Sequence, residues 1–245
     1  MGVMNQETGN RMCHTIGEDG VMVKDAVTKD GHAVVNDVYT PEEVQEMRSL
    51  LKKKNLFGQF GVRRFLKDHP EFLPLVLSAR LKTLLTPFFE NPFIVRSIYF
   101  DKPPNSNWVV QWHQDLTVNL IDRKEADGFT NWRILKDRAV AQPDMRFLKN
   151  MITLRIHLDH CDSTNGALRV VSGSHTNGVI DLRVDRNWDT NQEATCEVGE
   201  GGVMIMVILS LKYRIQEIFG MHNNKTNGKA LIMHVNVPHT DNKKK

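Results

Sequence analysis

The stretch "FIVRSIYF" (residues 93–100) marks the point where the chain changes from a helical to a β-rich pattern. Four further short runs of β-branched and apolar residues follow it, separated by clusters rich in Pro, Gly, Asn and Asp. They are "NWVVQWHQ" (107–114), "MITLRIHLD" (151–159), "GALRVVSGS" (166–174) and "GGVMIMVIL" (201–209). Short runs with this spacing are typical of strands. Because they follow a helical portion, they predict a β-sandwich or jelly roll supported by helices.

The helical portion contains one complete helix-start pattern, "TPEEVQEMRSLLKKK" (40–54). Thr40 is a candidate N-cap, Pro41 fits the first helical position, and Glu43 completes a capping box. Apolar residues then recur at helical spacing and predict one buried stripe. The stretch at 69–89 predicts a second helical region, divided near its internal proline.

These patterns predict a mainly β fold with N-terminal helices and a single domain. We expect a flexible N-terminal arm over residues 1–25 and one domain over residues 26–240. "HAVVNDV" (32–38) predicts a short strand ahead of the helices. The segment 118–150 is long and polar and reads as irregular, so we expect a lid or binding loop that carries substrate specificity.

Composition narrows the class of protein. The 245 residues are 40% hydrophobic and 25% charged, with a net charge of +3. No stretch concentrates Lys and Arg with aromatic residues, so we expect no nucleic-acid partner. The longest apolar run, 203–211, is too short to span a bilayer, so we expect no membrane partner. The three cysteines are odd in number and scattered, which predicts reduced thiols and a cytoplasmic location.

"WHQDLT" (112–117) places His113 and Asp115 two positions apart in a predicted strand. Residues i and i+2 of a strand point to the same face. An imidazole and a carboxylate on one face supply two thirds of a facial triad, the arrangement that holds Fe(II) with open positions. A surface strand with two polar residues is the alternative. Burial of a polar group is costly unless the group has a hydrogen-bonding or charged partner or binds a metal. His113 and Asp115 therefore either face solvent or form part of a site.

Two segments carry a family resemblance: "IYFDKPPNSNWVVQWHQDLT" (98–117) and "LRIHLDHCDSTNGALRVVSGSH" (154–175). They resemble the phytanoyl-CoA dioxygenase family of Fe(II)/2-oxoglutarate-dependent oxygenases. The resemblance implies a double-stranded β-helix, a jelly roll of the cupin type. It also implies Fe(II) and 2-oxoglutarate as cofactors, molecular oxygen as co-substrate, and hydroxylation of a small-molecule substrate. His113 and Asp115 match the first two metal ligands.

The resemblance also suggests residues of the cofactor pocket. Arg155 falls where many relatives line the 2-oxoglutarate pocket, and an inward guanidinium can pair with a carboxylate through two hydrogen bonds. A cross-strand ion pair is the alternative for Arg155. Lys102 and Gln111 are further pocket candidates, with a solvated surface as the alternative. His175 matches a position that is not a metal ligand, so we expect a structural hydrogen bond there.

The last part of the pattern departs from the family. The position of the distal metal-binding histidine falls on Lys212, and an ammonium has no lone pair to give iron. The arginine that anchors 2-oxoglutarate is expected near Ala230, where Lys229 is the nearby cation. His222 is a candidate third ligand, with an exposed loop histidine as the alternative. Two hypotheses remain: an active oxygenase that uses His113, Asp115 and His222, or a catalytically impaired relative that keeps the fold and ligand binding.

Overall fold

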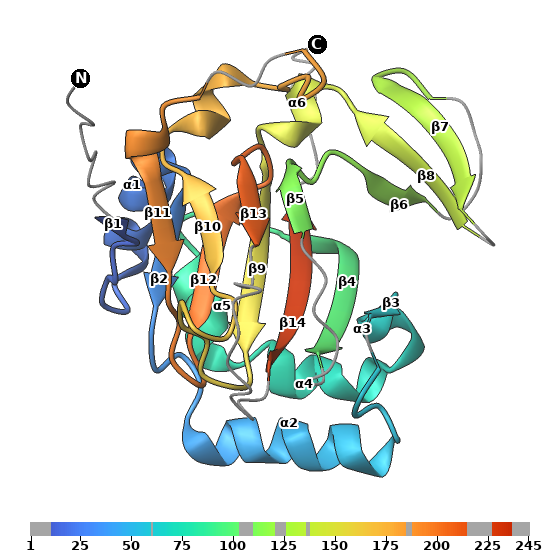
Figure 1. The fold of residues 1–245 in the computed structure, drawn as a ribbon. Coiled ribbons are helices and arrows are strands. Elements are labelled where there is room, and N and C mark those ends of the chain that lie inside the picture. The colour runs from blue at the N-terminus through green and yellow to red at the C-terminus, as the bar shows by residue number, and fades with distance from the viewer. Residues whose placement is uncertain are drawn as a thin grey trace, which may run out of the picture.

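The chain forms two facing β-sheets with helices packed on one of them, and a third, smaller sheet at one end (Figure 1). The structure is a computed structural model. It describes residues 11–59, 61–102, 110–120, 126–135, 138–184, 188–214 and 227–236. Among these residues, no helix is long and apolar enough to cross a membrane.

The helices lie mostly in the N-terminal third. They are α1 (Gly20–Asp30), α2 (Pro41–Lys53), α3 (Phe65–Asp68), α4 (Leu73–Val76), α5 (Ala79–Leu85) and α6 (Met145–Leu148), with 3₁₀ turns at Pro70–Phe72, Ser174–Asn177 and Thr190–Gln192. The predicted capping box of α2 is confirmed. The Thr40 hydroxyl accepts from the Glu43 backbone N–H, and the Glu43 carboxylate accepts from the Thr40 N–H. The second helical region is divided, but Pro74, where we expected the break, lies in the first turn of α4, and the chain breaks between α4 and α5 at Leu77 and Ser78.

The two large sheets supply the β-rich part. One has the order β1 (Arg11–Met12), β11 (Glu193–Cys196), β10 (Leu168–Val171), β13 (Lys212–Arg214), β5 (Val110–His113). The other has the order β2 (His32–Val35), β12 (Val203–Val207), β9 (Met151–His157), β14 (Asn227–Asn236), β4 (Phe93–Lys102), β3 (Val62–Arg63). The six runs predicted as strands all contain one, so this part of the prediction is confirmed.

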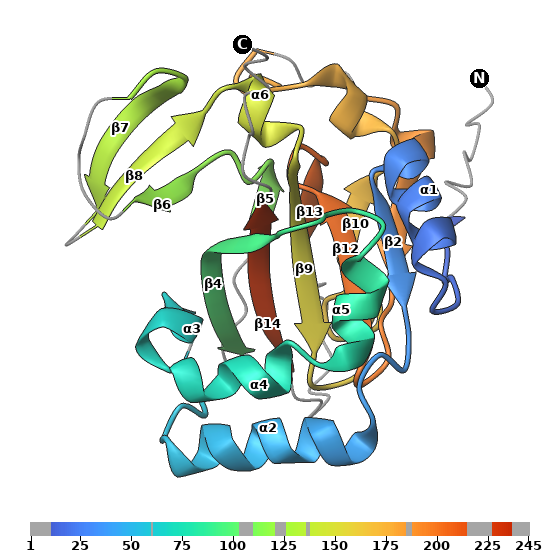
Figure 2. The ribbon, with the colours of Figure 1, turned by 180° about the vertical axis from the view of Figure 1, so that it is seen from behind.

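The six-stranded sheet has two different faces because side chains alternate along each strand. Its outer face packs against the helices, as Figure 2 shows for α4 and α5. The residues of β9 and β12 on that face are Ile152, Leu154, Ile156, Val203 and Ile205. The intervening residues point toward the five-stranded sheet. In β12 they are Met204 and Met206, whereas in β9 they include Thr153 and Arg155, so this inner face is apolar at one end and polar at the other.

The segment expected to be an irregular lid is a third sheet, which corrects that expectation. It consists of β6 (Val118–Leu120), β8 (Arg138–Pro143) and β7 (Phe129–Leu135), all antiparallel. Figures 1 and 2 show it extending beyond the two large sheets. The edge strand β7 lacks the alternation of apolar and polar residues that marks a half-buried strand, because it is exposed along most of its length.

The expectation of reduced thiols is also wrong for one pair of cysteines. Cys13 and Cys196 form a disulfide, whereas Cys161 lies outside it and is buried. The two cysteines are 183 positions apart in the chain, so no local sequence pattern predicts that they pair. Part of the expected N-terminal arm is built into the fold, since β1 pairs with β11 and α1 begins at Gly20. Residues 1–10 lie outside the described residues.

Candidate functional site

A cavity of about 180 Å³ lies between the polar halves of the two large sheets. The residues that give it its chemistry come from β4, β5, β9 and β13 and from the turn after β5. They are Arg96, His113, Asp115, Thr153, Arg155 and Lys212. Three of these, His113, Asp115 and Arg155, were predicted as site residues, and the fold brings all three into one cavity.

His113 is oriented and kept neutral by its surroundings. Its Nδ1 lies 2.8 Å from the backbone carbonyl oxygen of Gln111. Because a carbonyl can only accept, Nδ1 carries the proton, and Nε2 keeps its lone pair. Burial lowers the pKa of His113, and the nearby Lys212 ammonium lowers it further. A neutral imidazole with a free Nε2 lone pair is the form that binds metals.

Asp115 offers one oxygen toward His113 and the other toward a cation. His113 Nε2 lies 4.0 Å from Asp115 Oδ1. Two donors bound to one ion at about 2.1 Å lie roughly 3 to 4 Å apart, so this pair can share an ion after little movement. The second oxygen, Oδ2, lies 3.0 Å from the Lys212 Nζ.

Lys212 occupies the third place of the site. It lies directly opposite His113 in the antiparallel pairing of β13 with β5. Its side chain is only 4% exposed, and Nζ also donates to the backbone carbonyl of Ser210 at 3.3 Å. On the other face of these strands, Trp112 and Tyr213 stack with ring centroids 3.9 Å apart. This packing keeps Lys212 and His113 on the inner face.

Arg155 and Thr153 present polar atoms that lack a partner. Within the described part of the chain, Arg155 Nε and Thr153 Oγ1 are buried without a hydrogen bond. Burial lowers the pKa of Arg155, and buried polar groups left unpaired are costly. Arg63 and Arg96 also line the cavity, so four cationic side chains face one carboxylate there. The cavity is therefore suited to an anion with several acceptor oxygens.

Of the other predicted residues, Gln111 is described and lies outside this cavity. Gln111 is exposed, although its carbonyl holds His113. The side chain of Lys102 and all of His222 lie outside the described residues, so the structure leaves both predictions untested. His175 makes the kind of structural contact expected of it, with Nε2 donating to the Thr28 carbonyl at 3.1 Å.

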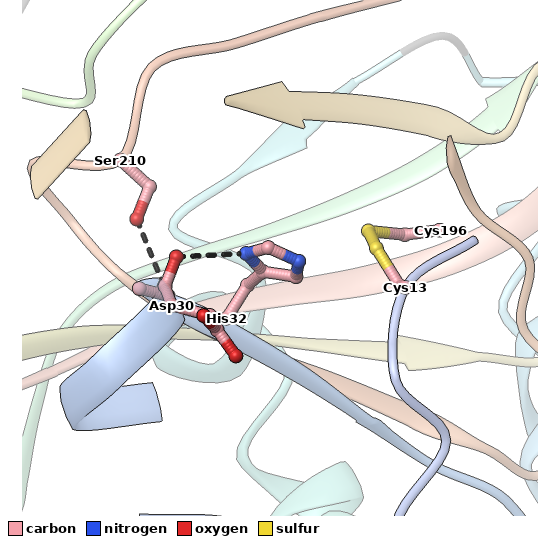
Figure 3. Close-up of a disulfide and its surroundings, with 6 residues drawn as sticks. Cys13, Asp30, His32, Cys196 and Ser210 are labelled. Atoms are coloured by element: carbon pink, nitrogen blue, oxygen red, sulfur yellow. Dashed lines mark hydrogen bonds between the residues drawn. A yellow bond between two sulfur atoms is a disulfide. The ribbon is translucent and has the colours of Figure 1, made fainter. Parts of the chain in front are cut away.

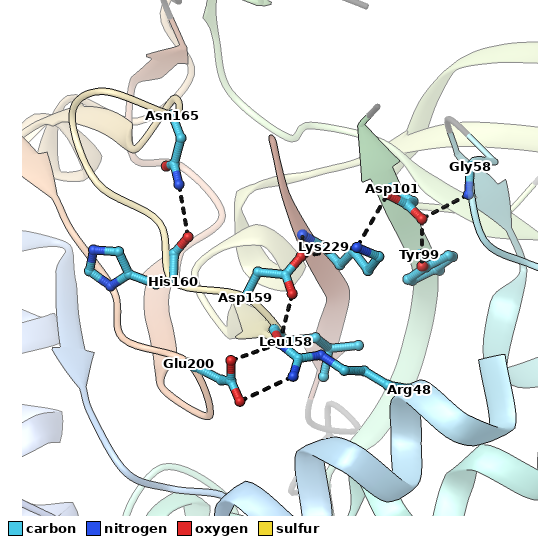
Figure 4. Close-up of polar contacts among 10 residues, drawn as sticks. All are labelled: Arg48, Gly58, Tyr99, Asp101, Leu158, Asp159, His160, Asn165, Glu200 and Lys229. Carbon is cyan, nitrogen blue, oxygen red and sulfur yellow. Dashed lines mark hydrogen bonds and ion pairs between the residues drawn. The ribbon is translucent and has the colours of Figure 1, made fainter. Parts of the chain in front are cut away.

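The closing strand β14 supplies no arginine to the cavity, as the sequence indicated. Ala230 is buried, and Ile232 lies opposite Arg155 in the pairing with β9. The Lys229 ammonium pairs with Asp159 at 3.2 Å and lies 3.9 Å from Asp101 (Figure 4). Lys229 therefore belongs to an ion-pair cluster on another side of the strand and does not replace the missing anchor.

Three polar residues of the cavity, Arg63, Arg96 and Thr153, were missed by sequence reasoning. Thr153, Arg155 and His157 are the polar members of "MITLRIH" (151–157), where they alternate with buried Ile and Leu. Polar residues at every second position of an otherwise apolar strand mark a face that lines a site. No such alternation marks Arg96, because it stands next to Ser97 in "FIVRSIYF" and the two side chains point to opposite faces.

Comparisons with known proteins identify the family of this chain. A family model described as phytanoyl-CoA dioxygenase (PhyH) matches residues 58–240, and the chain belongs to this family. The family uses Fe(II) and 2-oxoglutarate. A search of curated proteins found no match.

Similar solved structures include two that contain 2-oxoglutarate. HygX from Streptomyces hygroscopicus with nickel and 2-oxoglutarate bound is 14% identical, with TM-score 0.62, 89% of this chain and 87% of that chain covered. EvdO2 from Micromonospora carbonacea var. aurantiaca complexed with 2-oxoglutarate is 16% identical, with TM-score 0.61 and coverages of 88% and 90%. EctD from S. alaskensis in its apoform is 16% identical, with TM-score 0.63 and coverages of 94% and 82%. At these identities the likeness shows the fold.

The described residues fit the two family cofactors to different extents. For 2-oxoglutarate, the unpartnered Arg155 Nε and Thr153 Oγ1 offer donors in a cationic cavity. For iron, His113 and Asp115 supply two donors, but the third place holds an ammonium without a lone pair. The described part of the chain therefore accommodates 2-oxoglutarate but does not complete a three-ligand Fe(II) site.

Proposed function

We propose that this protein is an Fe(II)/2-oxoglutarate-dependent dioxygenase that hydroxylates an unidentified small molecule. In this proposal, His113 and Asp115 bind the iron, and His222, outside the described residues, is the candidate third ligand. We further propose that the two facing sheets form the double-stranded β-helix of a single domain, which also includes β1 and α1. The observation that carries the proposal is the convergence of His113, Asp115 and Arg155 on one cationic cavity.

Arg155 is the group that we propose for the far carboxylate of 2-oxoglutarate. It replaces the arginine missing from β14, because Arg155 and Ile232 are direct neighbours across the two strands. A guanidinium can hold a carboxylate through two parallel hydrogen bonds. Thr153, two residues earlier on the same face of β9, can donate its hydroxyl to the same anion.

Lys212 is compatible with bound iron only as a partner of the outer oxygen of Asp115. The two carboxylate oxygens have separate roles in that arrangement: Oδ1 faces His113, while Oδ2 accepts from Lys212. Metal-binding carboxylates commonly accept such a hydrogen bond on the oxygen that does not bind the metal. The cost is electrostatic, since a buried ammonium beside a divalent cation repels it.

A second candidate function follows from that same contact. The Lys212 ammonium already neutralises Asp115 at 3.0 Å, as an iron ion would. The protein would then be a catalytically impaired relative that binds 2-oxoglutarate, or a similar dicarboxylate, without retaining iron. Both candidates share the anion-binding cavity and differ only in the metal.

Anaerobic titration separates the two candidates. Isothermal calorimetry of the metal-free protein with 2-oxoglutarate measures the cavity alone, and absorption spectroscopy after adding Fe(II) measures the metal. The weak charge-transfer band of an iron–2-oxoglutarate complex, followed by succinate formation in air, supports the oxygenase. Binding of 2-oxoglutarate without that band supports the impaired relative. If neither 2-oxoglutarate nor Fe(II) binds, both candidate functions are wrong.

His113→Ala and Asp115→Ala should abolish the iron signal, and the chain offers a matched control. His160 and Asp162 form a second histidine and aspartate pair two positions apart, with Nε2 and Oδ2 3.3 Å from each other. His160 is exposed and does not line the cavity. His160→Ala should therefore leave the iron signal unchanged. If His160→Ala lost as much iron signal as His113→Ala and Asp115→Ala, the position of a residue in the cavity would not explain the loss.

A further inference from the structure

A second group of metal-binding side chains lies away from the cavity, where Cys13, His32 and Cys196 meet (Figure 3). The two sulfurs and one ring nitrogen of His32 all lie within 4.8 Å of one another, and all three residues are buried. They come from the loop after β1, the first residue of β2 and the last residue of β11. The fold therefore assembles this cluster from three distant segments.

His32 is held in the form that a metal requires. Its Nδ1 lies 3.1 Å from the backbone carbonyl oxygen of Asp30, so Nδ1 carries the proton and Nε2 keeps a lone pair. Burial lowers the pKa of His32 to about 4, so the ring is neutral near pH 7. A hydrogen bond from the second ring nitrogen to a carbonyl is the usual way in which proteins orient a metal-binding histidine.

The supporting loop is itself fixed. The Ser210 hydroxyl donates to the carbonyl of Gly31 at 2.8 Å and is buried. Gly31 has a φ of +83°, and a side chain there would collide with His175 and Ser210. The turn between α1 and β2 is therefore anchored at Gly31, directly before His32, which helps to hold the ring near the two sulfurs.

The surroundings of the cluster are soft and apolar. Cys13 and Cys196 belong to a buried cluster that also contains Met204 and Met206. Met206 lies directly opposite His32 in the pairing of β12 with β2, so its side chain is on the same face of the sheet. Thiolates and thioethers favour Cu(I) and Zn(II) over harder ions.

Coordination number decides between those two ions. Structural zinc sites almost always have four ligands in a tetrahedron. Here the described residues supply three donors in a water-poor, apolar region, which suits an ion that accepts three. A trigonal ion with bonds of about 2.2 Å holds its donors roughly 3.8 Å apart. The three groups lie within 4.8 Å of one another, and the two sulfurs, bonded to each other in the disulfide, would move apart to reach this spacing after reduction.

We propose that the reduced form of this cluster is a Cu(I) site made by Cys13, His32 and Cys196. In the structure the two cysteines form a disulfide, which is the oxidised, metal-free state. Thiol–disulfide exchange with a dithiol opens this disulfide. The dithiol transfers two electrons and two protons to Cys13 and Cys196, which become thiols, and is itself oxidised to a disulfide. Cu(I) then binds the two sulfurs with release of both protons.

The test measures Cu(I) binding by the full chain before and after reduction. Protein reduced with dithiothreitol and freed of it anaerobically is titrated with Cu(I) against a coloured competing chelator. We expect one Cu(I) per reduced chain and none in the disulfide form. Cys13→Ser and Cys196→Ser should each weaken binding at least about 100-fold, and His32→Gln about 10- to 100-fold.

Two control variants separate this cluster from other sites. Cys161→Ala removes a buried cysteine outside the cluster, and His113→Ala removes the imidazole of the cavity. Both should keep one tight Cu(I) per chain. Unchanged binding in the Cys13 and Cys196 variants, no binding by the reduced wild type, or loss in the His113 variant would overturn the proposal. Tighter binding of Zn(II) than of Cu(I), measured by the same competition, would overturn the choice of metal.

A measurement on the wild-type chain covers the case in which a variant fails to fold. The reduced protein is alkylated with iodoacetamide with and without one equivalent of Cu(I), and the labelled peptides are identified by mass spectrometry. Cu(I) should slow the labelling of Cys13 and Cys196 at least tenfold and leave Cys161 unchanged. Equal labelling rates of Cys13 and Cys196 with and without Cu(I) would contradict the site.

Discussion

Replacing Lys212 by histidine tests the electrostatic argument for the cavity most directly. The Lys212 ammonium lies 3.0 Å from Asp115 Oδ2 and is almost completely buried. Lys212→His removes that charge and places an imidazole opposite His113. Lys212→Gln is the matched control, because it removes the charge and adds no metal ligand.

The size of the effect follows from the contact. At an effective dielectric constant of about 20, opposite charges 3.0 Å apart attract with roughly 5 kcal/mol before the cost of desolvation is subtracted. Breaking a fully buried pair costs about 3–5 kcal/mol. Because the Asp115 side chain is 22% exposed, we expect Lys212→Gln to lower the free energy of unfolding of the metal-free protein by about 2 kcal/mol.

Iron binding should change in the opposite direction. Loss of the ammonium removes the repulsion of a divalent cation, so we expect Lys212→Gln to bind Fe(II) about tenfold more tightly, equivalent to about 1.4 kcal/mol. Lys212→His adds a third donor and should bind at least about 100-fold more tightly than wild type. Anaerobic Fe(II) titration with 2-oxoglutarate measures both, and urea unfolding measures stability. If the wild type binds iron as tightly as Lys212→His, Lys212 does not occupy a metal-ligand place.

Three further predictions concern the cavity and its frame. Arg155→Met should weaken 2-oxoglutarate binding by about 2–4 kcal/mol, because a buried carboxylate would lose its charged partner; calorimetry showing unchanged affinity would refute the assignment. Arg48 pairs with Asp159 and Glu200 at 2.7 Å. Arg48→Met should therefore lower the free energy of unfolding of the protein by about 2 kcal/mol. Burial disfavours ionised Asp159, but the Lys229 N–H and ammonium, with Arg48, outweigh it and hold its pKa below the usual value. The stabilisation of the fold by ionised Asp159 is therefore present above about pH 4 and is lost as the pH falls through the pKa of Asp159 in the folded protein. Urea unfolding should accordingly show a smaller difference in stability between wild type and Arg48→Met in acid. Gly201→Ala should cost about 3 kcal/mol, since φ is +77° and a Cβ would strike the backbone of residue 39; a thermal midpoint equal to wild type would contradict this.

Features encoded over a few neighbouring residues were predictable from the chain alone. The capping box of α2 depends on Thr40 and Glu43, three positions apart, and the strands depend on a period of two. His113 and Asp115 share a face for the same reason. The third sheet was missed because β7 is exposed along most of its length, so burial imposes no alternation on it.

Features that join distant parts of the chain depended on the folded arrangement. Whether Lys212 meets Asp115 is set by the register of β13 against β5, and a shift of one residue would turn its side chain to the other face. Among the described residues, the Nε of Arg155 has no hydrogen bond, and β14 places the apolar Ile232 opposite Arg155. The chain's local pattern therefore determines which side chains can face inward, but only strand pairing across many residues decides which charges meet, because their energies depend on distance and burial in three dimensions.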